Sequence, residues 1–187
     1  ATRDNLKNRV EALVASDESA EVKELFLGII KEMDLDIEDF RVEEQGKSVK
    51  VFTKHVVGNY STEILLSEES SGTKKLFGML PFIANSLKNG TVLVVDELDA
   101  KIHPVLLKYI IGLFTDKTVN KNGGQLIFTS HDLSSMNSDV FRRDEIWFVA
   151  KGVQQESKLY SLVEFKDDNG DAIRKDAKYD KQYLEGR

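Results

Sequence analysis

The sequence predicts an α/β fold with a mostly parallel core sheet. Residues 91–95 and 125–128 are short apolar runs without charge, as expected of strands buried on both faces of a parallel sheet. Between them, residues 103–114 have the apolar spacing of an amphipathic helix, with Pro104 in its first turn. Strand, helix and strand in this order predict two parallel strands joined by a right-handed crossover.

The first third of the chain is expected to contain helices followed by a small antiparallel section. Residues 5–14 and 20–33 have helical spacing, and the second segment carries an apolar stripe that we expect to pack against the sheet. Residues 40–44, 47–55 and 61–66 are expected to form strands joined by short turns.

A longer helix is expected after residues 70–73. Apolar side chains recur from Leu76 to Leu87, Asn89-Gly90 supplies a stop signal, and about four turns result. Pro81 should remove one hydrogen bond and bend this helix. The first amides of a helix lack internal partners and lie at its positive end, so the Ser-Ser-Gly-Thr turn could contact a phosphate. The same residues would also serve as an ordinary N-cap.

Polar side chains follow both predicted core strands. Asp96 and Glu97 end the first strand, and His131 closely follows the second. Ligands of open α/β sheets bind beyond the carboxyl ends of the strands, where all three side chains should meet. There, the first acid could hold Mg²⁺ and the second could orient or deprotonate an attacking water. A solvated acidic turn and a capped histidine at a strand end are the alternatives.

The C-terminal third is expected to be simpler. Residues 133–141 predict a short helix, and residues 145–149 and 158–165 a hairpin with Trp147 in the core. Residues 167–171 resemble part of a calcium loop but lack its spaced ligands and closing glutamate, so we expect a turn there. Residues 174–184 predict a terminal helix.

Together, these segments resemble the ATP-binding cassette (ABC) class of P-loop ATPases, whose motif order is signature loop, Walker B strand, D-loop and switch histidine. Gly72 precedes Asp96 by 24 positions, and Glu97 precedes His131 by 34, as expected for that class. The Ser-Ser-Gly-Thr signature departs from the transporter form Leu-Ser-Gly-Gly-Gln. With Asp-Glu-Leu-Asp-Ala-Lys-Ile-His-Pro after it, it resembles a soluble prokaryotic group: AAA-family ATPases of the RloA and abortive-infection type, distant relatives of RecF and SMC heads.

This resemblance covers roughly residues 18–187 and implies the C-terminal lobe of an ABC-type head, as one domain over residues 1–187. Residues 1–66 would precede the signature, and residues 67–187 would hold the motifs. In such heads, two subunits sandwich two ATP molecules. The resemblance implies that Glu97 and His131 are catalytic and that Asp96 binds Mg²⁺ through water. It also implies that ATP contacts and links across the interface are made by Ser70, Ser71, Gly72, Thr73 and Asp99.

The sequence contains no Gly-x-x-x-x-Gly-Lys-Ser/Thr segment. That loop supplies the backbone amides and the lysine that hold the β- and γ-phosphates. In ABC-class proteins it lies before the signature. We therefore expect this chain to be inactive alone and to need an N-terminal half for tight binding of ATP and Mg²⁺. The alternative is an ATPase fold that has lost the loop.

Composition narrows the class of protein further. The absence of cysteine excludes disulfides and thiolate metal sites. A net charge of −6 argues against broad electrostatic binding of nucleic acid by this chain. No apolar run approaches the ~20 residues that span a bilayer. A cytoplasmic protein without a membrane partner is therefore expected.

The expected function is ATP binding and hydrolysis at a composite homodimer interface formed by the signature and D-loop face. Phage defence, DNA repair and toxin control all use similar heads, so DNA and an effector protein from a neighbouring gene are candidate partners of the complete protein. Two alternatives remain. One is a non-catalytic interaction module. The other is the head of an overcoming-lysogenization-type nuclease, although the residues after Phe165 offer no acidic metal cluster for it.

Overall fold

The computed structural model describes residues 19–32, 37–45, 48–132 and 136–164. Residues 1–130 form one compact unit and residues 131–187 a second. The expectation of a single domain stays a prediction. The helices expected at 5–14 and 174–184, and the turn at 167–171, lie outside the described residues.

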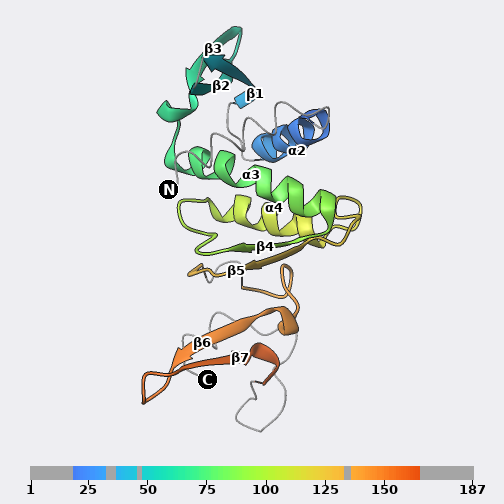
Figure 1. The fold of residues 1–187 in the computed structure, drawn as a ribbon, viewed down its shortest axis with the longest axis vertical. Helices are drawn as coiled ribbons and strands as arrows, with labels where there is room; N and C mark the ends of the chain where they lie inside the picture. Colours follow the sequence, from blue (N-terminus) through green and yellow to red (C-terminus); the bar gives the residue numbers. More distant parts are fainter. Residues whose placement is uncertain (1–18, 33–36, 46–47, 133–135, 165–187) are drawn as a thin grey trace. The chain divides into compact units, whose positions relative to one another are not determined.

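In its described part, the first unit combines helices with a three-stranded sheet and a two-stranded sheet (Figure 1). In chain order these are α2 (Ser19–Glu32), β1 (Ile37–Gln45), β2 (Ser48–Val57), β3 (Tyr60–Leu65), the 3-10 helix η1 (Leu66–Glu68), α3 (Ser71–Asn89), β4 (Val92–Val95), α4 (Pro104–Thr115) and β5 (Gln125–Phe128). Among the described residues, no helix combines the length and apolar composition needed to cross a membrane.

The expected antiparallel section is confirmed. β1, β2 and β3 pair in that order, and each strand is antiparallel to its neighbour. Gly58 joins β2 to β3 with a φ of 60°, which glycine adopts without steric penalty. On the sheet surface, Arg41 pairs with Glu63 and lies over the ring of Phe52 at 4.2 Å. Such exposed contacts contribute little stability.

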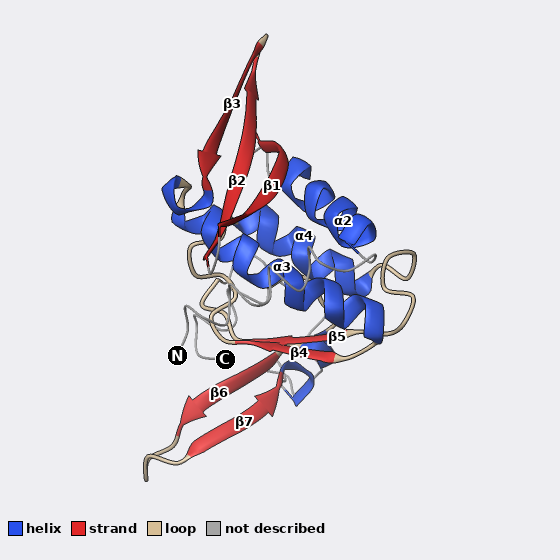
Figure 2. Ribbon diagram, turned by 45° about the horizontal axis from the view of Figure 1, so that its top comes forward, coloured by secondary structure: helices blue, strands red, loops and turns tan. Residues whose placement is uncertain are grey.

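The hydrophobic core of the first unit lies among its helices. Helices α2, α3 and α4 lie between the antiparallel sheet and the β4–β5 pair (Figures 1 and 2). The α2 helix contacts β1 as well as α3 and α4. The most buried apolar side chains of these helices are Ile29 and Ile30 of α2, Leu76, Leu80 and Ile83 of α3, and Leu107 and Ile110 of α4.

Helix α3 is longer than the four turns expected, with 19 residues that continue through Pro81. It ends where Gly90 adopts a left-handed conformation with a φ of 64°, as the Asn-Gly stop signal predicted. The Asn122 side chain donates a hydrogen bond to the carbonyl of Lys88 at 2.7 Å and so helps to satisfy the last turn of the helix.

The β4–β5 pair is parallel, as predicted, with Val92 opposite Gln125 and Val95 opposite Phe128. Burial on both faces was a wrong prediction. Val94 is 71% exposed and Ile127 57% exposed, whereas the side chains that alternate with them are partly buried. The reason is that the described helices of this unit cover one face of the pair (Figure 2).

The second unit contains η2 (Arg143–Glu145), β6 (Trp147–Lys151), β7 (Ser157–Ser161) and η3 (Leu162–Glu164). The predicted hairpin is confirmed by the antiparallel pairing of β6 with β7. Ile146, Phe148 and Leu162 form its small core. Trp147, expected in the core, is instead 54% exposed, because alternate residues of a strand point to opposite faces. Of the helix expected at 133–141, the described residues 136–141 are not helical and contain a turn at 138–140.

Candidate functional site

The two predicted carboxylates lie in a turn directly after β4. Residues 96–101 form this acidic turn, and the side chains of Asp96 and Glu97 are both exposed. Thr129, one residue beyond β5, links them. Its hydroxyl donates to Oδ1 of Asp96 at 2.5 Å and accepts from the backbone N–H of Glu97 at 2.8 Å. Parallel pairing of the strands therefore places a hydroxyl where it fixes both acidic residues.

Glu97 has an unusual backbone conformation. Its φ is 48°, in the left-handed region, which costs a non-glycine residue roughly 1–2 kcal/mol. Hydrogen bonds hold both ends of the residue: its N–H donates to Thr129, and its carbonyl accepts from the Lys75 ammonium at 2.6 Å. The surrounding contacts thus offset the strain and set the direction in which the Glu97 carboxylate leaves the turn.

Buried side chains and backbone hydrogen bonds anchor the rest of the acidic turn. Leu98 is fully buried, and its N–H donates to the carbonyl of Thr129 at 3.0 Å. Ile102, also buried, donates to the carbonyl of Asp99 at 3.0 Å. His103 caps α4, with Nδ1 accepting from the N–H of Val105 at 3.3 Å. These contacts make the turn a fixed element rather than a loose loop.

The signature turn, residues 69–73, caps helix α3. The Ser70 hydroxyl accepts from the N–H of Thr73 at 3.1 Å and lies 2.8 Å from the hydroxyl of Thr73. The N-cap role considered for these residues is therefore confirmed. The Thr73 side chain is 2% exposed, so its hydroxyl serves the turn. Helix geometry leaves the amides of Ser71 and Gly72 without an intrahelical acceptor, which suits an anion.

The signature turn and the acidic turn are in direct contact. A Cβ at position 72 would lie 2.7 Å from the carbonyl oxygen of Lys101, so this approach requires glycine. The Lys75 ammonium donates to the carbonyls of Glu97, Leu98 and Ala100. Six predicted residues are thereby brought into two touching segments of the first unit, and these are Ser70, Ser71, Gly72, Thr73, Asp96 and Glu97.

Asp99 also lies in the acidic turn, and its side chain is partly buried. His131 is the first residue of the second unit, and its side chain is exposed. The structure therefore groups seven of the eight predicted residues, and the shared edge expected for His131 stays a prediction.

Glu69 connects the signature turn to the antiparallel sheet. Its Oε1 accepts from the Thr53 hydroxyl at 2.5 Å and lies 2.7 Å from Nε2 of His55. The Glu69 side chain is only 8% exposed and that of His55 19% exposed. Through these contacts, Glu69 attaches the start of the signature turn to strand β2.

Sequence reasoning missed Lys75 and Thr129. Lys75 follows Gly72 by three positions, so it lies on the same helix face, the face that meets the acidic turn. Burial lowers the pKa of the Lys75 ammonium, while the carboxylates of Asp99 and Glu97 oppose this shift. Thr129 is the first residue after β5, at the strand edge where ligand-contacting residues are expected. The spacing of Lys75 from Gly72 and the place of Thr129 at the end of a strand could have indicated these two residues from the sequence.

The carboxylate of Asp96 is a candidate ligand for Mg²⁺. Among the described residues, no cluster of three or more His, Asp or Glu side chains could hold a metal ion. Mg²⁺ is commonly held by one or two carboxylates together with water and substrate phosphates. The exposed carboxylate of Asp96, oriented by Thr129, meets that requirement.

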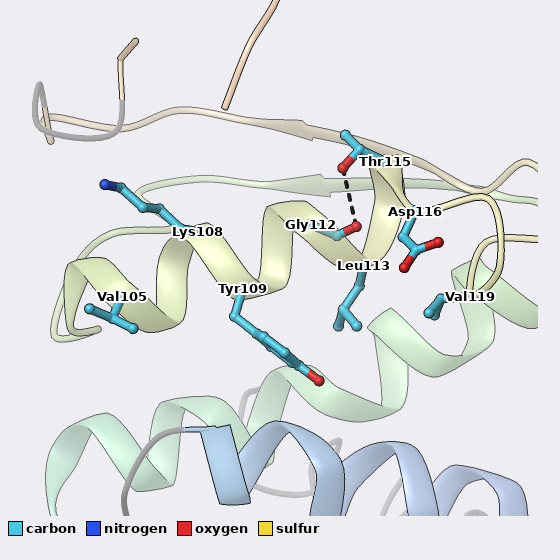
Figure 3. Close-up of a pocket in the computed structure, with 8 residues that line it drawn as sticks. All are labelled: Val105, Lys108, Tyr109, Gly112, Leu113, Thr115, Asp116 and Val119. Atoms are coloured by element: carbon cyan, nitrogen blue, oxygen red, sulfur yellow. Dashed lines mark hydrogen bonds between the residues drawn. The ribbon is translucent and has the colours of Figure 1, made fainter. Parts of the chain in front are cut away.

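An open pocket lies on α4 and the turn that follows it (Figure 3). Its lining residues are Val105, Lys108, Tyr109, Gly112, Leu113, Thr115, Asp116 and Val119. The hydroxyl of Thr115 donates to the carbonyl of Gly112 at 3.1 Å, which completes the end of the helix. None of these residues belongs to the signature turn or the acidic turn, so the pocket is separate from the candidate site.

The sequence and the fold of this chain can be compared with those of known proteins. No curated protein matches the sequence. Among solved structures, the fold is similar to a chain described as "Structural biochemistry of ATP-driven dimerization and DNA stimulated activation of SMC ATPases". The TM-score is 0.54 at 16% identity, and the similarity covers 75% of this chain and 82% of that chain. At this identity the likeness shows the fold alone.

A family model described as "AAA domain, putative AbiEii toxin, Type IV TA system" matches residues 4–137, more than half of the chain. The fold is thus α/β, with a parallel strand pair, flanking helices and a small antiparallel sheet, and it is shared with the head of an SMC ATPase. The chain belongs to this AAA-domain family of P-loop ATPases of the abortive-infection type.

Proposed function

We propose that this chain is the C-terminal lobe of a cytoplasmic ATPase that binds and hydrolyses ATP at a composite homodimer interface. One observation carries the proposal. The signature turn and the acidic turn touch through Gly72 and Lys75, so a helix N-terminus and two exposed carboxylates belong to one fixed element. Membership of an ATPase family supports the same conclusion.

Phosphoryl transfer to water requires an oriented nucleophile and neutralisation of charge on the phosphates. Glu97 would orient the water, because its backbone is held at both ends and its carboxylate is exposed. Asp96 would bind Mg²⁺, which supplies positive charge beside the phosphates. Thr129 would keep the Asp96 carboxylate in position through its hydrogen bond.

The remaining predicted residues would act across the dimer. The amides of Ser71 and Gly72, with the Ser70 hydroxyl, would contact the γ-phosphate of ATP held mainly by the partner chain, and Thr73 would support that turn from within. Asp99 would link the two sites across the interface. His131 would contact the γ-phosphate of its own subunit. A phosphate held by two chains stabilises their association, and its hydrolysis removes that link.

The proposal includes a phosphate-binding loop in polypeptide that precedes this sequence. Phage defence or toxin control is the proposed setting, since the family description names a toxin of a type IV system. DNA and an effector protein remain proposed partners of the complete protein. The DNA-stimulated activation named for the similar SMC ATPase supports DNA as the first partner to test.

The test is Mg-ATP turnover by this chain and by the full-length product of its gene, each with Glu97→Gln. We expect Glu97→Gln to lower kcat of the full-length protein roughly 100-fold or more, and to accumulate an ATP-bound dimer in size-exclusion chromatography with light scattering. Glu24→Gln, a change at an exposed position of α2, is the matched control and should leave turnover unchanged. Unaltered turnover by Glu97→Gln would refute the assignment.

Absence of Mg-ATP turnover by the wild-type full-length protein would instead favour the non-catalytic interaction module. In that case a phosphate-binding loop would be absent or degenerate in the complete gene product. Turnover by this chain alone would contradict the expectation that the lobe needs its N-terminal half.

A further inference from the structure

We propose that Lys75 is a positioning residue that holds the backbone of Glu97 in its left-handed conformation and thereby ties the signature turn to hydrolysis. The proposal rests on the ATPase function proposed above. It assigns to Lys75 a role that does not involve contact with the phosphates. Its basis is the set of hydrogen bonds that joins one side chain of α3 to three carbonyls of the acidic turn.

The geometry matches the chemistry of an ammonium group. Lys75 Nζ lies 2.6 Å from the carbonyl oxygen of Glu97, 2.9 Å from that of Ala100 and 3.2 Å from that of Leu98. An ammonium has three N–H donors and no acceptor, so three carbonyls satisfy it completely. Hydrogen bonds from a charged donor are stronger than those between neutral groups. Three backbone carbonyls of the acidic turn therefore bind the Lys75 ammonium.

These contacts argue against Lys75 as a direct phosphate ligand. All three donors point at backbone carbonyls, and contact with a phosphate would require breaking at least one of these bonds. Lys74, by contrast, is exposed, and its ammonium donates one hydrogen bond, to the carbonyl of Ser67 at 3.2 Å. The two adjacent lysines therefore differ: the Lys75 ammonium contacts the acidic turn, whereas the Lys74 ammonium makes only an exposed contact outside both turns.

The position of Lys75 explains how the signature turn could influence Glu97. Gly72 and Lys75 lie on the same face of α3, and both touch the acidic turn. A shift of the first turn of α3, such as a ligand at Ser71 and Gly72 would cause, would move the Lys75 ammonium with it. The carbonyl of Glu97 would move in turn, because it is held at 2.6 Å. The carboxylate of the same residue would then change direction.

Two measurements on Lys75→Met test the proposal, with Lys74→Met as the matched control. In the full-length protein, we expect Lys75→Met to lower kcat about 10- to 100-fold while KM for ATP changes less than about threefold, since only an orienting interaction is lost. In this chain, amides of residues 97–101 should exchange with deuterium faster in Lys75→Met than in wild type. Lys74→Met should match wild type in both measurements.

Lys75→Arg keeps the proposal testable if Lys75→Met fails to fold. A planar guanidinium retains the charge but cannot place its donors on three carbonyls in the same way, so we expect a kcat between those of wild type and Lys75→Met. An unchanged kcat in Lys75→Met, or unchanged exchange at residues 97–101, would overturn the positioning role. A rise in KM equal to the loss of kcat/KM would also overturn it, because Lys75 would then serve ATP binding.

Failure of this proposal is distinguishable from failure of the proposed function. If the wild-type full-length protein lacks turnover that depends on Glu97, the ATPase assignment and the link to hydrolysis both fail. The exchange measurement then still decides whether Lys75 holds the acidic turn, since it requires neither ATP nor catalysis.

Discussion

At the scale of single residues, Thr129 shows how one hydroxyl can organise a site. It donates to Asp96 and accepts from the N–H of Glu97, so it uses both hydrogen-bonding roles of a hydroxyl. Valine has nearly the same shape but can make neither bond. Serine can make both. The pair of variants therefore separates hydrogen bonding from packing.

We expect Thr129→Val to lower kcat of the full-length protein about tenfold or more, and to lower the free energy of unfolding of this chain by about 1–2 kcal/mol, because two hydrogen bonds are lost. Thr129→Ser should retain most of both quantities. Turnover assays and urea denaturation provide the comparison. Equal activity of the valine and serine variants would show that the hydroxyl is dispensable.

The sequence allowed the placement of some residues of the candidate site to be predicted, but not that of others. Asp96 and Glu97 could be predicted because they directly follow an apolar run, and Ser70 because N-cap residues act within a few positions of themselves. Lys75 and Thr129 act on partners 22 to 33 positions away, so their roles depend on how separate elements pack. The left-handed φ of Glu97 is likewise imposed by those partners.

At the scale of elements, helix boundaries were predicted better than burial. Helix α3 is delimited by local signals, a serine N-cap and a glycine at its C-terminal end. Burial of β4 was predicted wrongly because exposure depends on which faces other elements cover, and Val94 lies on the face that the described helices leave open. The contact between α3 and the acidic turn is a further element-scale property, since it requires a glycine at one position.

We expect Gly72→Ala to lower the free energy of unfolding of this chain by about 1–3 kcal/mol, because its Cβ would lie 2.7 Å from the backbone carbonyl of Lys101 and force a shift. Gly112→Ala in α4 is the control. A Cβ there meets nothing within 4 Å, so this change should be neutral or stabilise the chain by up to about 1 kcal/mol. Urea denaturation measures both, and a similar result for the two variants would contradict the tight contact.

At the scale of the molecule, a charged pair joins two layers of the first unit, helix α2 and the antiparallel sheet. Lys23 of α2 pairs with Asp39 of β1 at 2.8 Å, and both side chains are nearly half exposed. Burial raises the pKa of Asp39. The hydrogen bond and positive charge of Lys23, together with the backbone N–H of Phe40 and the charge of Lys54, outweigh this effect and leave the pKa below its usual value. The ionised carboxylate is therefore favoured in the folded state.

A carboxylate with a lowered pKa in the folded state contributes stability that is present above its unfolded pKa and lost as pH falls through the folded value. We expect Lys23→Met to cost at most about 1 kcal/mol at pH 7, and this cost to shrink below about pH 4. Urea denaturation at pH 7, 5 and 3 measures it, with the exposed Lys108→Met as control. A difference that stays constant with pH would exclude an ionic origin.

The parallel pairing of β4 with β5 also constrains how the protein assembles during synthesis. The hydrogen bond from Thr129 to Asp96 joins residues 33 positions apart, and α4 lies between them. Contacts between distant residues form late, because the intervening chain must be closed into a loop first. Helix α3 can form from local signals while the ribosome is still extending the chain. The acidic turn acquires its Thr129 hydrogen bonds only once residue 129 has emerged, so this turn is completed after helix α3.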